Sequence, residues 1–331
     1  MRIKGVSYDT GFVLNGRVGR AAQFDRDLVE HELRVIRDEL HCTAVRVMGG
    51  DPDRIELAAT IAAGLGLEVW FSPYPLEQSQ AQMLELFADC AERAERLRRT
   101  GASVVFVTGA EHSLMNPGFV AGRDTDERLR RLLDPATVRE QVGPLAERLN
   151  AFLRQAVAVV RERFAGPVTY AAIQLERVDW SLFDVLSMDL YRSADSAGRF
   201  ADGVAQLVAL GKPVAITEFG CATYRGAAGD GARGLEVIEV DADRVPVRVN
   251  GVRERDEAGQ AREVRELLEL FEAAGVEAAF VFTFALYDYP HRPGDPAADL
   301  DLGSYGLVRV LEGRPWEPKE AFEAVARFYR G

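Results

Sequence analysis

Residues 214–220 have the sequence Val-Ala-Ile-Thr-Glu-Phe-Gly, and this stretch decides the fold. Four apolar or β-branched residues lead into Glu218, and Gly220 ends the segment two positions later. The pattern predicts a buried strand with a glutamate at its carboxyl end. A strand holds side-chain geometry better than a loop does, so Glu218 is a candidate catalytic carboxylate at the mouth of a barrel. The alternative is an acid at a strand end that forms a surface salt bridge.

A second apolar segment leads into another glutamate. Residues 104–112 have the sequence Val-Val-Phe-Val-Thr-Gly-Ala-Glu-His, which places Glu111 just past the end of a predicted strand. By our strand count Glu111 follows strand 4 and Glu218 ends strand 7. In an eight-stranded barrel these strands lie on opposing sides of the mouth, so the two side chains can converge. Retaining glycoside hydrolysis needs two carboxylates about 5–5.5 Å apart, and repulsion between like charges would keep one of them protonated.

Short apolar segments alternate with helical patterns along the chain, which is typical of repeated βα units and a parallel sheet. We predict eight strands, the number that a closed (β/α)8 TIM barrel uses. They span residues 3–8, 43–48, 67–72, 103–108, 168–173, 185–190, 214–218 and 278–284. The sequence therefore predicts the α/β class and one (β/α)8-barrel catalytic domain over residues 1–331.

Two connections are longer than a minimal barrel needs. Residues 112–138 follow strand 4, and residues 221–255 follow strand 7. Within the second insertion, residues 235–240 and 245–249 predict a β-hairpin, and Pro246 would confine its second arm to an edge. Because both insertions leave the carboxyl ends of strands, both could wall a cleft.

Composition limits the kinds of partner. The net charge of −12 argues against nucleic acid and against anionic membrane surfaces. No apolar run approaches the roughly 20 residues of a membrane span, and the N-terminal residues do not have the pattern of a signal peptide, so we expect a cytoplasmic protein. Cys42, Cys90 and Cys221 predict no disulfide framework. The four histidines lack metal-ligand spacing, and we expect no cofactor and no metal.

Over nearly its full length, the chain resembles clan A of the glycoside hydrolases, barrel enzymes with catalytic glutamates after strands 4 and 7. Residues 216–220 resemble the clan's nucleophile segment, so the resemblance implies that Glu218 is the nucleophile and Glu111 the acid/base. It also implies that Arg46 is the strand 2 arginine that contacts the nucleophile, and that Tyr191 is the tyrosine found after strand 6. We identify no family within the clan.

Two residues depart from the clan's pattern. Ala110 stands where the clan has an asparagine that binds the sugar 2-hydroxyl, a bond that strengthens in the transition state and is worth several kcal/mol. The neighbouring His112 could compensate, or the sugar is an uncommon one. On strand 8, Phe284 stands where many members place a tryptophan platform.

Further side chains at strand ends could line a carbohydrate site. Aromatic rings would stack on sugar faces, and polar groups would bind hydroxyls. Each is singly more often structural than functional. These candidate substrate-binding residues are Tyr8, Trp70, Tyr74, Gln174 and His291.

The sequence therefore predicts a retaining glycoside hydrolase acting on a small glycoside or oligosaccharide by a two-glutamate double displacement. The first alternative is an inactive barrel that binds carbohydrate or a protein partner, which Ala110 supports best. The second is a metal-dependent barrel isomerase or lyase. The sequence leaves open the sugar, the linkage, the oligomeric state and the role of residues 221–255.

Overall fold

A computed structural model gives the structure and describes residues 1–14, 16–20, 24–134, 136 and 138–331. Eight strands form a closed barrel in the order β1-β12-β9-β8-β7-β6-β5-β4. Their bounds are β1 Ile3–Asp9, β4 Ala44–Gly49, β5 Glu68–Pro73, β6 Val104–Ala110, β7 Val168–Ala172, β8 Leu186–Asp189, β9 Val214–Glu218 and β12 Ala278–Val281. The pairings β1–β12, β12–β9, β5–β6, β6–β7 and β7–β8 are parallel. The predicted (β/α)8 barrel is confirmed.

One predicted strand is too long. The segment 278–284 was expected to be a single strand, but β12 ends at Val281 and a cis peptide joins Phe282 to Thr283. The Thr283 N–H then donates to the Tyr305 carbonyl, outside the barrel, and the Phe284 N–H donates to the Ser7 carbonyl of β1. Phe284 therefore follows the strand instead of lying on it.

Helices separate most barrel strands and begin and end where their sequences predict. Asp51 caps α2 through the N–H groups of Asp53 and Arg54, with Pro52 at the first helical position. Ser79 and Gln82 form a capping box on α3. The helices are α1 Arg26–Asp38, α2 Pro52–Gly64, α3 Gln80–Arg99, α4 His112–Met115, α5 Thr125–Leu133, α6 Val138–Arg161, α7 Ala197–Val208, α8 Ala227–Asp230, α9 Glu257–Ala274 and α10 Glu320–Arg330. None of these helices, over the residues described, is long and apolar enough to span a membrane.

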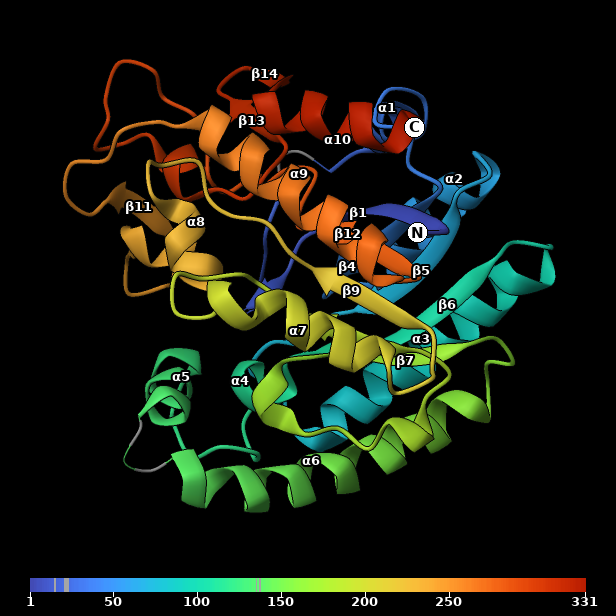
Figure 1. The fold of residues 1–331 in the computed structure, drawn as a ribbon. Helices are drawn as coiled ribbons and strands as arrows, with labels where there is room; N and C mark the ends of the chain where they lie inside the picture. Colours follow the sequence, from blue (N-terminus) through green and yellow to red (C-terminus); the bar gives the residue numbers. More distant parts are fainter. Residues whose placement is uncertain (15, 21–23, 135, 137) are drawn as a thin grey trace. The chain divides into compact units, whose positions relative to one another are not determined.

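The contacts of the chain gather into two compact units. Unit 1 comprises Met1–Asp9, Ala22–Val45 and Leu190–Gly331, and unit 2 comprises Thr10–Ala21 and Arg46–Asp189. Within unit 1, α10 lies against α9, and within unit 2, α6 lies against α3 (Figure 1). The single domain over residues 1–331 stays a prediction.

The insertion after β9 contains the expected hairpin. Its arms are β10 Ile238–Val240 and β11 Pro246–Val249, which pair antiparallel. The first arm is shorter than predicted, because residues up to Val237 form the 3-10 helix η4 Gly231–Val237. Pro246 lies in a two-stranded sheet, so it is on an edge strand as expected.

The insertion packs on a small core of its own within unit 1. Side chains from η4, β10 and β11 meet the 3-10 helix η5 Leu300–Gly303 and Tyr305. The Thr223 N–H donates to the Leu302 carbonyl, and the Val249 N–H donates to the Ala297 carbonyl. The function of residues 221–255 stays a prediction.

Smaller elements complete the described chain. The remaining pairs of strands are antiparallel, and two further 3-10 helices flank β8 on its N-terminal side. They are β2 Val13–Leu14, β3 Arg17–Val18, β13 Val308–Leu311, β14 Arg314–Pro318, η2 Gln174–Glu176 and η3 Trp180–Leu182.

All three cysteines are free and buried, in agreement with the expected absence of a disulfide framework. Cys90 lies on the buried face of α3, where helical spacing placed it. Burial raises the pKa of each thiol, which keeps Cys42, Cys90 and Cys221 in the unreactive protonated form.

Packing of β1 against β12 leaves no room at Gly5. A Cβ built there would lie 2.4 Å from the ring of Phe280, its register partner. We predict that Gly5→Ala lowers the free energy of unfolding by about 1–3 kcal/mol, the usual effect of overpacking a core. The matched control is Gly64→Ala at the end of α2, where a Cβ meets nothing within 4 Å and which should be neutral or stabilising. Urea unfolding of both variants measures the difference, and equal stabilities would contradict the prediction.

Candidate active site at the carboxyl ends of the strands

Glu218 is the last residue of β9, and it is buried. The Leu190 N–H donates to the Glu218 carbonyl at 2.8 Å, which fixes the backbone of the strand end. The Tyr191 hydroxyl donates to Glu218 Oε2 at 3.0 Å. A hydrogen bond to a carboxylate stabilises its ionised form. The structure therefore brings together Glu218 and Tyr191, as the sequence predicts.

Two aromatic residues that the sequence analysis did not select lie next to this pair. Tyr191 meets Tyr305 edge to face at 5.7 Å between ring centroids, and Tyr305 meets Phe282 in the same way at 5.9 Å. The Tyr305 hydroxyl donates to the Gly231 carbonyl at 2.5 Å and accepts from the Gly234 N–H at 2.8 Å. The aromatic row is thus tied to the insertion after β9.

Phe284 does not occupy the position expected of it. Its ring is buried and meets Trp316 edge to face at 5.3 Å, with Tyr8 on another side at 6.4 Å. Phe282, two residues earlier, is only partly buried. A ring that stacks on a sugar needs an accessible face. The expectation for Phe284 is therefore wrong, and Phe282 replaces it as the aromatic candidate after β12.

Glu111 lies one residue beyond β6 in a left-handed conformation, with φ of 45° and ψ of 42°. This conformation costs a non-glycine residue about 1–2 kcal/mol. The surroundings hold it: the Glu111 N–H donates to the Ala171 carbonyl at 2.9 Å, and the Glu111 carbonyl accepts from the N–H groups of Leu114 and Met115 on α4. Such strain is typical of functional positions. The Glu111 side chain is half-buried.

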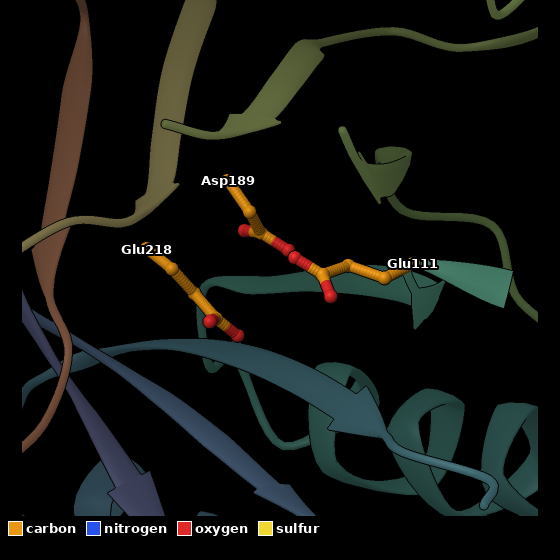
Figure 2. A group of neighbouring side chains, drawn as sticks. All are labelled: Glu111, Asp189 and Glu218. Atoms are coloured by element: carbon orange, nitrogen blue, oxygen red, sulfur yellow. The ribbon is translucent and has the colours of Figure 1, made fainter. Parts of the chain in front are cut away.

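Asp189 is a third carboxylate that the sequence analysis did not select. It is the last residue of β8, and its side chain is fully buried. Carboxylate oxygens of Asp189 and Glu111 lie within 4.8 Å of each other, and the two side chains point toward one another in Figure 2, which also draws Glu218. The pattern that selected Glu111 and Glu218, an acid at the end of an apolar strand, also fits Asp189.

Arg46 on β4 is buried, and a buried arginine needs an anionic partner. Its Nη1 lies 3.9 Å from Asp189 Oδ1, and its Nε donates to Ser72 Oγ at 3.2 Å. The guanidinium also lies 6.0 Å from the ring centre of Tyr74, which follows β5. The structure thus brings Arg46, Tyr74 and Asp189 together in unit 2, while the contact of Arg46 with Glu218 stays a prediction.

His112 is a structural residue instead of a substrate ligand. It is fully buried, and its Nε2 lies 2.8 Å from the Thr108 carbonyl. Burial lowers the pKa of its imidazole to about 4. The expectation that His112 compensates for Ala110 is therefore wrong, because the ring is enclosed by the aromatic side chains of Phe87, Phe119, Phe152 and Tyr170.

The polar atoms of Trp70 and Tyr8 form hydrogen bonds within the barrel. Trp70 is buried, and its Nε1 donates at 2.9 Å to Glu68, at the amino-terminal start of β5, so the indole is directed away from the carboxyl ends. The Tyr8 hydroxyl donates to Glu32 Oε2 at 2.5 Å, and both residues are buried. Trp70 and Tyr8 are therefore packing residues of the barrel, and the expectation that they bind sugar is wrong.

The last two candidates, Gln174 and His291, differ in their surroundings. Gln174 begins η2 directly after β7 and is exposed, so it stays a candidate. His291 belongs to an ion-pair network, with its Nδ1 2.9 Å from Asp299 Oδ1 and 2.9 Å from Arg255 Nη2. Arg255 ends the insertion after β9, so His291 holds that insertion in place instead of facing a sugar.

No metal is assigned to the carboxylates of Glu111, Asp189 and Glu218. Grouped acids are common without an ion, and the guanidinium of Arg46 already supplies positive charge beside Asp189. The expected absence of a metal or cofactor stays a prediction.

Comparisons with known proteins bear on the fold. No family model matches the chain, and no curated protein matches it. A GH113 β-1,4-mannanase of known structure superposes with a TM-score of 0.65 at 17% identity, with all of both chains covered. The shared fold is the (β/α)8 barrel. PbGH5A, a glycoside hydrolase family 5 enzyme from Prevotella bryantii B14, superposes with a TM-score of 0.52 at 10% identity, covering 98% of this chain and 96% of that one. Gas2p of Saccharomyces cerevisiae gives 0.54 at 12% identity, and this chain spans 63% of its length.

The buried imidazole of His112 predicts a pH-dependent stability. Its pKa of about 4 lies below the ordinary 6.5. Between these pH values the His112 imidazole is protonated in the unfolded chain and neutral in the folded chain. The contribution is therefore complete above pH 6.5 and is lost as the pH falls toward 4; it amounts to about 3 kcal/mol. Urea unfolding at several pH values should show a smaller loss in His112→Phe than in the unchanged protein. His31→Asn, at an exposed position, is the control, and identical pH dependence in all three proteins would contradict the assignment.

Proposed function

We propose that this chain is a glycoside hydrolase that cleaves a glycosidic bond with retention of configuration. The observation that carries the proposal is the placement of two glutamates, Glu111 and Glu218, at the carboxyl ends of β6 and β9. These are the fourth and seventh strands of the closed barrel. Active sites of such barrels are built at this face, and a retaining mechanism needs two carboxyl groups about 5–5.5 Å apart.

In the first step Glu218 attacks the anomeric carbon. Its ionised carboxylate forms a bond to that carbon while the glycosidic oxygen departs, which gives a covalent glycosyl-enzyme. The hydrogen bond from the Tyr191 hydroxyl fixes the direction of Oε2. Because the Glu218 backbone belongs to the sheet, the nucleophile is held at a defined place in the mouth.

Glu111 serves both steps. In the first, it donates its proton to the departing oxygen; in the second, it takes a proton from the water that attacks the glycosyl-enzyme, which releases the sugar and restores Glu218. Glu111 follows β6 directly and holds a left-handed backbone conformation. No cofactor takes part in either step.

The sugar-binding residues follow from the corrected site. Phe282 is the aromatic candidate because its side chain is only partly buried, and Gln174 is an exposed polar candidate. We expect the substrate to be a small glycoside or oligosaccharide. The similarity to a β-1,4-mannanase makes mannosides the first substrates to test. The cytoplasmic location stays a prediction from the sequence.

Ala110 favours a second candidate function, a barrel that binds carbohydrate without cutting it. The residue is buried and carries no group that could bind the sugar 2-hydroxyl. The same experiment separates the two functions, because a binding protein has no nucleophile that forms a covalent bond.

Covalent labelling tests the proposed nucleophile. We expect activated 2-fluoro glycosides, offered as a panel that includes a mannoside, to add one glycosyl group to Glu218. The fluorine slows both formation and hydrolysis of the glycosyl-enzyme, and the good leaving group restores its formation, so the intermediate accumulates. Intact mass and peptide mapping measure the adduct. Glu218→Gln should remain unlabelled, and Glu147→Gln, at an exposed position on α6, should label as the unchanged protein does.

Labelling at any other residue would overturn the role of Glu218, and unlabelled protein that still binds oligosaccharide would favour the binding function.

The role of Glu111 has its own test. Glu111→Ala should lose about 10²–10⁴-fold in turnover of substrates with poor leaving groups. Azide should restore turnover of a dinitrophenyl glycoside, because that leaving group needs no acid and azide needs no base.

Removal of metal ions should leave the activity unchanged. Both proposed steps use carboxyl groups alone, so dialysis against EDTA and readdition of Mg²⁺, Ca²⁺ or Mn²⁺ should alter the rate by less than about twofold. A loss of activity that one of these ions reverses would instead favour the metal-dependent barrel isomerase or lyase. Metal analysis of the purified protein accompanies the rate measurement.

A further inference from the structure

Asp189 has no role in the proposed steps, although it lies beside one of the two glutamates. Its side chain is fully buried at the end of β8. Its carboxylate and that of Glu111 approach within 4.8 Å and face one another (Figure 2). Two carboxylates at such a distance do not both ionise readily, because each charge disfavours the other.

Arg46 decides which of the two keeps its charge. Its guanidinium lies 3.9 Å from Asp189 Oδ1, and neither side chain is exposed. Ser72 Oγ accepts from Arg46 Nε at 3.2 Å, which holds the guanidinium on this side. An arginine stays protonated throughout the accessible pH range, so it favours the ionised form of the acid beside it. Asp189 is therefore the anion of the pair.

We infer that Asp189 is a positioning residue that acts through Glu111: its buried negative charge keeps the proton on Glu111 until the proton is transferred to the leaving group. The inference rests on the proposed function in naming Glu111 as the acid. The same charge makes Glu111 a stronger base in the second step, when it must take a proton from water.

The other titratable groups around Glu111 do not offset this charge. Tyr170 on β7 is neutral, because burial raises the pKa of its phenol well above the usual range, and it donates to Glu176 on η2, whose pKa burial also raises. His112 on α4 is neutral at any pH above about 4. Glu218 is a further acid and ends β9, the seventh strand of the barrel along the chain. Arg46 is the only cation in this set.

Direct titration of Glu111 tests the inference without any substrate. Protein labelled with ¹³C at the glutamate side-chain carboxyl is titrated by NMR, and the Glu111 signal is assigned by its absence from Glu111→Gln. In the unchanged protein we expect a midpoint above the ordinary value of about 4.3. Asp189→Asn removes the charge at nearly constant shape and should move the midpoint down by about one pH unit. Asp195→Asn, an exposed acid in the loop after β8, should leave it in place.

The pH profile of kcat/KM gives a second reading that a merely structural role would not move. Loss of activity at high pH reports the acid, so Asp189→Asn should shift that limb down by about the same amount, while Asp189→Glu restores it. A midpoint at or below 4.3 in the unchanged protein, or one unmoved by Asp189→Asn, would overturn the inference. If Asp189→Asn does not fold, Asp189→Ser removes the same charge and is titrated in its place.

The two proposals fail in different ways. If no glycoside is cleaved or labelled, the proposed function fails while the NMR titration still measures the effect of Asp189 on Glu111. If glycosides are cleaved but the midpoint is ordinary, the function stands and the role of Asp189 is wrong.

Discussion

Closure of a mostly buried sheet into a barrel is the constraint on which the rest of this structure depends. Once eight strands are hydrogen-bonded in a ring, the strand ends are fixed relative to their neighbours by backbone bonds. The acids at positions 111, 189 and 218 each follow or end such a strand. Burial of the strands stabilises the fold, and the same burial removes water from the side chains at their ends, which strengthens every charge interaction there.

The cost of placing carboxylates in such surroundings is reduced locally within each unit. Glu218 receives a hydroxyl hydrogen bond from Tyr191, and Asp189 lies beside the guanidinium of Arg46. Glu111 is held in a left-handed conformation by its bond to Ala171 and by α4. Behind that turn, His112 is enclosed by aromatic rings, and a Cβ at Gly109 would lie 2.3 Å from its imidazole. Glycine at position 109 is therefore required for this close approach.

Some candidates failed because position in a strand does not fix the direction or the depth of a side chain. Trp70 follows the aromatic pattern of a mouth residue, yet its indole bonds to Glu68 at the opposite end of β5. Phe284 and Phe282 are indistinguishable by type, and only the end of β12 at Val281 shows which one is enclosed. Asp189 fitted the pattern used for both glutamates, but a strand-ending aspartate is common enough that the sequence alone did not single it out.

The sequence by itself determined the barrel, the strand positions to within a few residues, the hairpin after β9 and the two glutamates, because periodicity and strand-ending acids are local properties of the chain. Only the tertiary structure decided which side chains meet. The pairing of Tyr191 with Glu218, of Arg46 with Asp189, and of Asp189 with Glu111 joins residues far apart in the sequence. The burial of His112 likewise depends on α3, α6 and β7 packing around it. Such contacts arise from packing between elements, and no pattern within one element records them.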